Sequence, residues 1–264
     1  MKSILLANNI NELIYQLKST QNLQIVGGCT SIEQLGEKTI STIGIKELST
    51  IIRHERFLDV GPAVTLNQLL NVGQNHLPQI LYEALKSIAN PMIRNIATIG
   101  GNICAQDHKR TLFAPLLALE ARLVFKSQSE TKIETIQNFK NIPQGFVLTN
   151  IRIPLPDSTL SIFRRVGPEN IISQLSASFA FLVSTERNSI KDVSLAFAGP
   201  FIFKSKALEN ALLGHKLPLT QKDIESIQEQ VETEFEKAAT DQMISDVVRR
   251  QFFNLCRYSF EQLA

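Results

Sequence analysis

Hydrophobic positions in the first part of the chain switch repeatedly between helical and strand spacing. An amphipathic helix is predicted where apolar residues recur at Ile10, Leu13, Ile14 and Leu17. Further helices are predicted over 78–89, with Pro78 at the first helical position, and over 111–121. Short apolar runs predict strands at 22–26, 39–45, 57–60 and 122–126. The first part is therefore expected to mix helices and strands.

The pattern changes near Pro154 and Pro156, which end a strand and mark a boundary. Three runs with apolar residues at every second position then predict an antiparallel meander, at 161–166, 173–185 and 191–199. Helices are predicted over 205–213, closed by Gly214, over 221–239, opened by a Thr220/Asp223 capping box, and over 243–263. We expect an α+β protein with domains at 1–157 and 158–264, the first with subdomains of about 1–55 and 56–157.

Composition is that of an ordinary globular protein and argues against two kinds of partner. Hydrophobic residues make up 44% and charged residues 20% of the 264 residues, enough for a sizeable core. The 27 Lys and Arg nearly balance the 25 Asp and Glu, so no nucleic-acid surface is expected. No apolar segment is long enough to cross a bilayer, so no membrane partner is expected either.

The N-terminal sequence and the cysteines bear on the cellular compartment in which the protein is expected. The first residues lack the long apolar region and cleavage site of a signal peptide. Cys29, Cys104 and Cys256 are an odd number, far apart, and fit free thiols in a reducing compartment. We therefore expect a cytoplasmic protein.

Two segments place adjacent glycines before small polar residues, Val26–Ser31 and Thr98–Asn102, and both are expected to follow a strand. Glycine lets a ligand approach backbone N–H groups, and successive N–H groups in a turn bind anions such as a diphosphate. Thr30, Ser31 and Thr98 add hydroxyl donors. The alternative is that each glycine pair is only a tight turn or bulge. Spacing alone leaves both interpretations open.

Other familiar sites are not indicated. The sequence has no G-x-G-x-x-G, so a Rossmann dinucleotide site is not supported, and no phosphate-binding P-loop motif. G-x-S-x-G and H-E-x-x-H are also missing. The histidines, His54, His76, His108 and His215, are scattered in expected loops, so no metal site is predicted. Tyr82 and the acids near Asp107 lack the partners of a general base, so no catalytic residue is predicted.

The run "NPMIRNIATIGGNIC" followed by "APLLALEARLVF" resembles the FAD-binding (medium) subunit of the molybdenum hydroxylases, the xanthine dehydrogenase and carbon monoxide dehydrogenase flavoprotein family. Ile93-Arg94-Asn95, Thr98–Ile103 and Leu116–Leu119 match the central motif of that family. "VGGCTS" resembles its N-terminal Ala-Gly-Gly loop, and "NIRIPLP" and "FAGPFIFKSKALENALLG" resemble its later segments. The resemblance covers nearly the whole chain.

The resemblance implies a two-subdomain FAD-binding fold of the vanillyl-alcohol-oxidase (PCMH) type, with a C-terminal α+β domain of a small antiparallel sheet and helices. Carried over by position, the implied FAD contacts fall into three groups. The diphosphate would be held by Val26, Gly27, Gly28, Cys29, Thr30, Ser31, Thr98, Gly100, Gly101 and Asn102. The rings would be lined by Ile88, Ala89 and Leu148, and a basic residue near the flavin pyrimidine would be Arg164 or Arg165.

Two positions depart from the family pattern. After Asn102 the family continues with Ala-Ser-Pro and then an Asp that contacts FAD, whereas here Asp107 and His108 replace Ser-Pro and Thr111 replaces the Asp. Thr111 still offers a hydroxyl hydrogen bond, weaker than one to a carboxylate by about 1 kcal/mol. Cys29 stands where the family prefers Thr or His; we expect it to be a small buried space-filler, and the alternative is a reactive thiol.

The resemblance also implies a function: passing electrons from iron–sulfur clusters through FAD to NAD or another acceptor. The chain lacks cysteine clusters for iron–sulfur centres and the length for a pterin domain. A molybdopterin-binding large subunit and a 2Fe-2S small subunit are therefore the implied partners. One alternative is a flavin-free structural subunit with a degenerate FAD site. Another is a free-standing flavin reductase of the cell-wall precursor type, although nothing matches the acid and Ser that such an enzyme needs.

Overall fold

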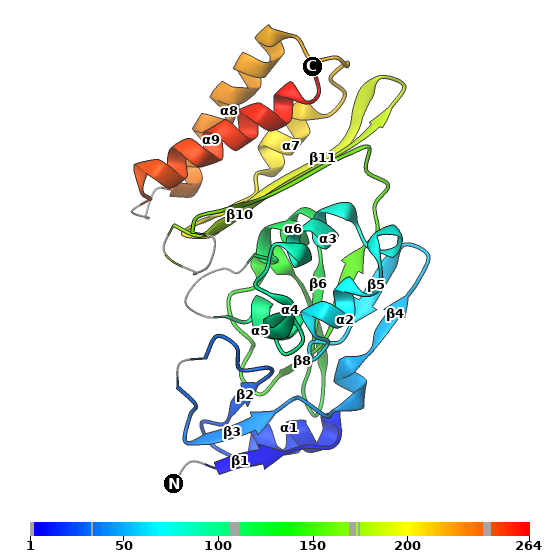
Figure 1. The fold of residues 1–264 in the computed structure, drawn as a ribbon, viewed down its shortest axis with the longest axis vertical. Helices are drawn as coiled ribbons and strands as arrows, with labels where there is room; N and C mark the ends of the chain where they lie inside the picture. The colour runs from blue at the N-terminus through cyan, green and yellow to red at the C-terminus, as the bar shows by residue number, and fades with distance from the viewer. Residues whose placement is uncertain (1–2, 33, 106–110, 169–172, 174, 240–243) are drawn as a thin grey trace. The chain divides into compact units, whose positions relative to one another are not determined.

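The computed structural model describes residues 3–32, 34–105, 111–168, 173, 175–239 and 244–264. The chain divides into two compact units (Figure 1). Unit 1 comprises 1–78, 88–107 and 119–155, and unit 2 comprises 79–87, 108–118 and 156–264. Two short segments that precede the second half of the chain therefore pack with it.

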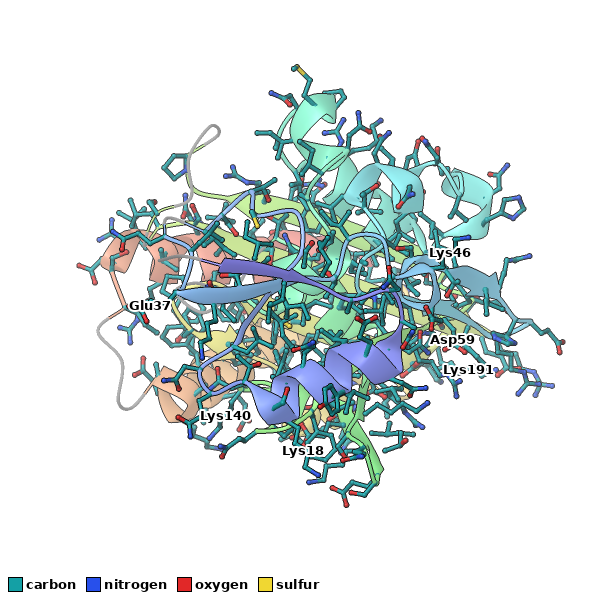
Figure 2. All side chains as sticks on the ribbon, turned by 90° about the horizontal axis from the view of Figure 1, so that it is seen from below. Lys18, Glu37, Lys46, Asp59, Lys140 and Lys191 are labelled. Carbon is teal, nitrogen blue, oxygen red and sulfur yellow. The ribbon has the colours of Figure 1, made fainter. Side chains whose placement is uncertain are left out.

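The first sheet of unit 1 is small and parallel. Its strands are β1 (Ser3–Leu6), β2 (Gln24–Val26) and β3 (Lys38–Ser41), in the order β1-β3-β2. Helix α1 (Ile10–Ser19) buries Leu13 and Ile14 in one core with Ile40 of β3. Lys18, which projects from this helix in Figure 2, donates to Gln128 Oε1 at 2.9 Å. The predicted first helix and the strand that leads into Gly27 are confirmed.

The second sheet of unit 1 is antiparallel, with five strands in the order β4-β5-β8-β6-β7. These strands are β4 (Ile51–Arg53), β5 (Phe57–Val60), β6 (Arg122–Lys126), β7 (Thr131–Thr135) and β8 (Val147–Pro154). Strand β8 ends at Pro154, as the prolines predicted. The 3₁₀ turns η1 (Lys46–Ser49), η2 (Gln74–His76) and η3 (Ile136–Asn138) also belong to this unit.

Three short helices complete unit 1: α2 (Leu66–Leu70), α4 (Pro91–Arg94) and α5 (Ile99–Ile103). The expectation that Gly100 and Gly101 follow a strand was wrong, because both lie inside α5. Thr98 is the N-cap of this helix, and its side chain accepts a hydrogen bond from the Gly101 N–H. A favourable cap and close packing thus override the strand preference of the β-branched residues before the glycines.

Unit 2 is built on an antiparallel sheet in the order β12-β11-β10-β9, so the predicted meander is confirmed. Its strands are β9 (Leu160–Val166), β10 (Ala177–Glu186), β11 (Ser189–Ala198) and β12 (Ile202–Phe203). Helices α3 (Gln79–Lys86) and α6 (Phe113–Ala118) contact this sheet, α3 at β9 and α6 at β10 and β11.

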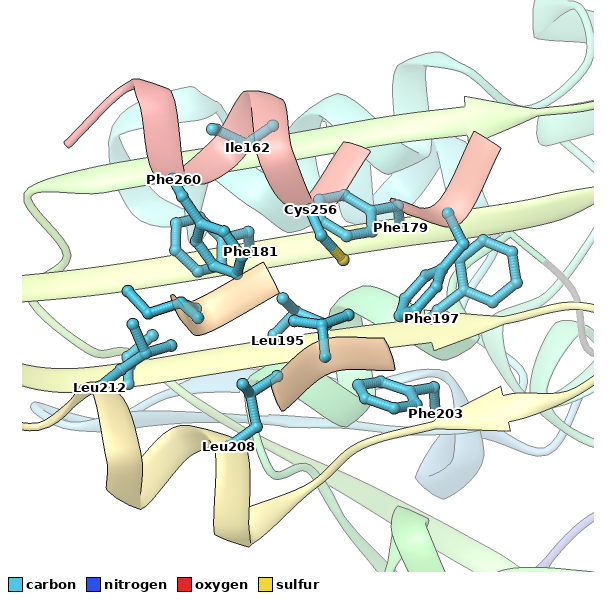
Figure 3. Packing of buried hydrophobic residues seen from close by; sticks show 14 of the residues in the cluster. Ile162, Phe179, Phe181, Leu195, Phe197, Phe203, Leu208, Leu212, Cys256 and Phe260 are labelled. Atoms are coloured by element: carbon cyan, nitrogen blue, oxygen red, sulfur yellow. The ribbon is translucent and has the colours of Figure 1, made fainter. Parts of the chain in front are cut away.

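An aromatic core joins the sheet of unit 2 to helices α7 (Lys206–Leu212), α8 (Gln221–Ala239) and α9 (Asp246–Glu261). Phe181 meets Phe260 edge-on in this core (Figure 3), with ring centroids 5.8 Å apart. The predicted capping box is confirmed, because Thr220 N–H donates to Asp223 Oδ2 at 2.9 Å and Asp223 N–H to Thr220 Oγ1 at 3.3 Å. The last helix was expected from Met243, which lies outside the described residues; α9 starts after its N-cap, Ser245.

Candidate cofactor site

The two glycine segments singled out from the sequence lie against each other in unit 1. A β-carbon placed on Gly27 would be 2.7 Å from Thr98 Oγ1, and one on Gly28 would be 1.8 Å from the Ile96 carbonyl oxygen. Only glycine permits so close an approach of two backbone segments. The chain thus brings Val26–Ser31 and the residues before α5 to one place.

The loop of residues 27–31 presents backbone N–H groups that the protein does not use. Within the described part of the chain, no acceptor takes a hydrogen bond from the N–H groups of Gly27, Gly28, Cys29, Thr30 or Ser31. Cys29, Thr30 and Ser31 are exposed, and the two glycines are half-buried. Five successive open amides after a strand end are the chemistry of an anion-binding loop.

Cys29 occupies a backbone conformation that side chains rarely adopt. Its φ is +54°, in the left-handed region that favours glycine, and its thiol lies 3.5 Å from the Gly27 carbonyl oxygen. The expectation that Cys29 is a buried space-filler was wrong, because the residue is exposed. Cys29 therefore lies at the surface, in the turn that follows β2.

The N–H groups at the start of α5 are paired inside the protein. Ile99 N–H donates to Val64 O at 3.0 Å, Gly100 N–H to Pro62 O at 2.9 Å, and Gly101 N–H to Thr98 Oγ1 at 3.1 Å. Gly100 is buried, and a β-carbon there would be 2.6 Å from Pro62 Cβ. The absence of a side chain at Gly100 therefore serves packing against Pro62.

Gly101 differs from its neighbour because it is exposed. A β-carbon at Gly101 would meet only Thr98 Oγ1, at 3.1 Å. Thr98 itself is 3% exposed, and among the described residues none accepts its hydroxyl proton. The Thr98 hydroxyl is thus a buried donor beside the open loop, and Gly101 keeps its surroundings clear.

The segment Ile88–Ala89, expected to line a ring of FAD, is held by an arginine to which the sequence assigned no role. Arg94 Nη1 donates to Ile88 O and to Ala89 O, both at 2.7 Å. Ala89 is exposed, with φ at +43°. The only feature of the sequence that could have pointed to Arg94 was its position in the Ile-Arg-Asn part of the family motif.

The remaining predicted residues of unit 1 are more enclosed. Asn102 is half-buried in α5, and its N–H donates to Thr98 O at 3.0 Å. Leu148 is 4% exposed on β8, opposite Phe125 of β6. Asp107 and His108 lie outside the described residues.

Three predicted residues belong to unit 2. Thr111 is half-buried before α6. Arg164 lies on the face of β9 that carries Ile162 and Val166 into the core of α7–α9, and its guanidinium lies 5.5 Å from the centre of the Tyr258 ring. Because side chains alternate along a strand, Arg165 is on the opposite face. The structure thus separates the two candidates, and Arg164 is engaged with α9.

Neither a metal centre nor a membrane segment emerges from the residues that the structure describes. No group of three His, Cys, Asp or Glu in these ranges is placed to hold a metal ion. Of the helices they form, none combines the length and apolar character needed to cross a bilayer. Among the described residues, the unpaired backbone N–H groups of residues 27–31 and the buried hydroxyl of Thr98 are the groups best suited to bind a ligand.

An open amide loop beside a buried hydroxyl, on an α+β scaffold, is typical of a protein that binds an anionic cofactor. Residues 1–156 match the family described as the FAD binding domain in molybdopterin dehydrogenase, and the chain belongs to that family. The expectations of FAD as cofactor and of an oxidoreductase subunit are confirmed by this membership.

Curated relatives extend the comparison. The glyceraldehyde dehydrogenase medium chain of Sulfolobus acidocaldarius is 23% identical over 228 residues, covering 80% of each chain. The xanthine dehydrogenase FAD-binding subunit of Escherichia coli O157:H7 is 39% identical over 88 residues, which are 33% of this chain and 30% of the relative. Other relatives are much longer: this chain spans 15% of an indole-3-acetaldehyde oxidase of Zea mays.

Solved structures share the fold. The carbon monoxide dehydrogenase from Hydrogenophaga pseudoflava contains a chain that matches with a TM-score of 0.82 at 18% identity, covering 99% of this chain and 95% of that one. At this identity the likeness concerns the fold, and it confirms the α+β architecture.

Proposed function

We propose that this chain is the FAD-binding electron-transfer subunit of a multi-subunit molybdenum hydroxylase of the xanthine dehydrogenase type. Within it, the loop Val26–Ser31 holds the diphosphate of FAD. The observation that carries the proposal is the row of five open amides, at Gly27–Ser31, beside the buried hydroxyl of Thr98. A diphosphate satisfies such donors without a lysine, because amide dipoles supply the positive field.

The other residues divide the work of binding. The Thr98 hydroxyl and the Asn102 side chain add donors, and Gly101 places no side chain beside the buried Thr98 hydroxyl. Gly100 contributes indirectly, by letting α5 approach Pro62. Ile88, Ala89 and Leu148 line the rings, and Thr111 supplies a hydroxyl where the family has an acid. The basic residue near the flavin pyrimidine is Arg164 or Arg165, which lie on opposite faces of β9, and Arg164 also contacts Tyr258.

Bound FAD supplies the redox chemistry, taking up electrons and releasing them to an acceptor. The protein's part is to bind and orient the cofactor. The proposed route runs from a molybdenum site and 2Fe-2S clusters in partner chains to NAD or another acceptor. Two relatives are named as a medium chain and as an FAD-binding subunit, which supports a multi-chain assembly with a molybdopterin-binding large subunit and a 2Fe-2S small subunit.

The proposal extends to the architecture. We propose subdomains of about 1–55 and 56–157 in a fold of the vanillyl-alcohol-oxidase (PCMH) type, each built on one of the two sheets of unit 1, with β4 (Ile51–Arg53) in the second sheet and with α3 and α6 packed on the sheet of unit 2. The sheet and helices formed after residue 158 support a separate C-terminal domain.

The alternative is a structural subunit that no longer binds FAD. Thr111 in place of the family's Asp is the feature that favours it, because a charge-assisted contact is lost. The open amides favour the first proposal, since a subunit with no anion to bind gains nothing from leaving them exposed.

Titration of the purified, flavin-stripped chain with FAD tests the proposal, followed by quenching of flavin fluorescence. FAD should bind and ADP should compete for the site, because both carry a diphosphate. Riboflavin, which has none, should bind at least tenfold more weakly, a difference of about 1.4 kcal/mol. Failure to bind FAD would support the structural subunit, and equal affinity for riboflavin would contradict the role of the loop.

A further inference from the structure

Arg94 and the segment Ile88–Ala89 form a closed local structure in unit 1. Arg94 is the last residue of α4, and its Nη1 reaches back to the carbonyl oxygens of Ile88 and Ala89 at 2.7 Å each. Asn90, between them, is the N-cap of α4 and accepts a hydrogen bond from Ile93 N–H at 2.9 Å. The loop is therefore joined to its helix at both ends.

The two hydrogen bonds from Arg94 form a clamp on the turn Ile88–Ala89, and Ala89 in this turn has an unusual backbone conformation. Ala89 has φ at +43°, which a residue with a β-carbon adopts only where its surroundings impose it. The carbonyl groups of Ile88 and Ala89 both accept a hydrogen bond from Arg94 Nη1, so they must point toward the same atom. The positive φ of Ala89 makes this orientation possible. A charged donor makes stronger hydrogen bonds than a neutral one, so it can hold a strained turn.

The same short segment reaches the diphosphate loop. Two residues after Arg94, the carbonyl oxygen of Ile96 lies where a β-carbon on Gly28 would approach to 1.8 Å. Thr98 follows, with Oγ1 beside Gly27. Residues 94–98 thus contact both the segment expected to line a ring of FAD and the loop expected to bind its diphosphate.

We propose that Arg94 is a positioning residue for FAD, one that does not touch the cofactor but fixes the ring-lining turn Ile88–Ala89 relative to the diphosphate loop. This inference rests on the proposed function. Its consequence is that Arg94 controls how a bound flavin is oriented as well as how tightly it binds. Lysine, with its single nitrogen, can restore part of the clamp, whereas methionine cannot.

The experiment compares Arg94→Met and Arg94→Lys with the wild type, using FAD as the probe. Arg152→Met is the matched control, because Arg152 is also in unit 1 but binds Asp59 on the second sheet (Figure 2 labels Asp59). Three quantities are measured: FAD affinity, the visible circular dichroism of flavin bound at saturation, and the Cα and Cβ chemical shifts of Ala89 in the flavin-free protein.

For Arg94→Met we expect FAD affinity to fall roughly tenfold to a hundredfold, the range found when residues that hold metal-binding side chains in place are removed. Its flavin dichroism should change, and the Ala89 shifts should leave the values of a left-handed residue. Arg94→Lys should recover part of each change, and Arg152→Met should show none of them.

Unchanged Ala89 shifts in Arg94→Met would overturn the clamp, and altered shifts with unchanged FAD binding and dichroism would overturn the positioning role. An equal loss of FAD in Arg152→Met would assign the effect to general destabilisation and also overturn it. Failure of the wild-type chain to bind FAD is a separate result, which contradicts the proposed function while the Ala89 shifts still report on the clamp.

Discussion

Thr98 Oγ1 lies so close to Gly27 that a β-carbon on the glycine would be 2.7 Å from it. The two residues are far apart in the sequence, in a loop after a parallel strand and at the cap of a short helix. Their contact brings a buried hydroxyl to a row of open amides. The predictions below follow from this arrangement and from its surroundings.

Thr98 and Thr65 form a natural pair for mutation. Each caps a five-residue helix, α5 or α2, and they face each other in an antiparallel bridge. Replacement by Val should cost about 1 kcal/mol of stability at either position, because each loses an N-cap. Only Thr98→Val should also weaken FAD binding, about tenfold, by removing a donor beside the diphosphate. Urea unfolding and FAD titration separate the two effects, and equal FAD affinity in both variants would exclude Thr98 from the site.

Gly100 and Gly101 should respond differently to the same change. Gly100→Ala should destabilise the fold by about 1–3 kcal/mol, since its β-carbon would lie 2.6 Å from Pro62 Cβ and 2.7 Å from Pro62 O. Gly101→Ala should leave stability within about 1 kcal/mol, because the added carbon meets only Thr98 Oγ1, at 3.1 Å, and alanine favours a helix. FAD retention should fall in Gly101→Ala. The reverse order of stabilities in urea would contradict these separate roles.

The three cysteines should react with a thiol reagent in a fixed order. Cys29 is exposed, Cys104 half-buried and Cys256 buried, and burial raises the pKa of the Cys256 thiol well above its usual value. Cys29 should label first and Cys256 only on unfolding. Saturating FAD should slow labelling of Cys29 severalfold by covering the loop. Cys29→Ser should remove the fast phase, and a rate indifferent to FAD would argue against occupation of the loop.

Asp59 should make the stability of unit 1 depend on pH in the acid range. Partial burial alone would raise the pKa of Asp59, but hydrogen bonds from Arg152 and Asn150 and attraction to Arg152 and His54 bring it below the ordinary 3.8. A lowered carboxyl pKa stabilises the folded state above the unfolded value and loses that contribution as pH falls through the folded pKa. Stability should therefore decline below about pH 4, and Arg152→Met should flatten the decline. An unchanged pH profile in that variant would count against the pair.

The sequence predicted those elements whose pattern depends on local spacing. Helix α1 and strands β9–β11 have a clear apolar period, because one face of each contributes to a core, although β10 is buried on both faces from Ala177 to Val183. Strand β7 was not predicted, since its residues are exposed apart from the half-buried Glu134 and it carries no such period. Helix α5 was predicted as a strand end because its formation depends on Pro62 and Val64, which a local window does not contain.

The candidate site shows the same limit. Gly27 and Gly28 were found from composition, since paired glycines before small polar residues indicate open backbone. The different roles of Gly100 and Gly101 could not be predicted from the sequence. They differ because Gly100 packs against Pro62, which is distant in the sequence, whereas Gly101 does not. The role of Arg94 was also beyond the sequence, since its partners are backbone carbonyls, which any residue supplies.

The central claim is that the backbone amides of residues 27–31 bind the FAD diphosphate. The most direct measurement is the ¹H–¹⁵N spectrum of the flavin-stripped chain during titration with FAD. The account predicts that the five amide protons of Gly27–Ser31 shift together, downfield, as hydrogen bonds to phosphate oxygens form. Saturation with FAD while these five resonances stay in place would contradict it.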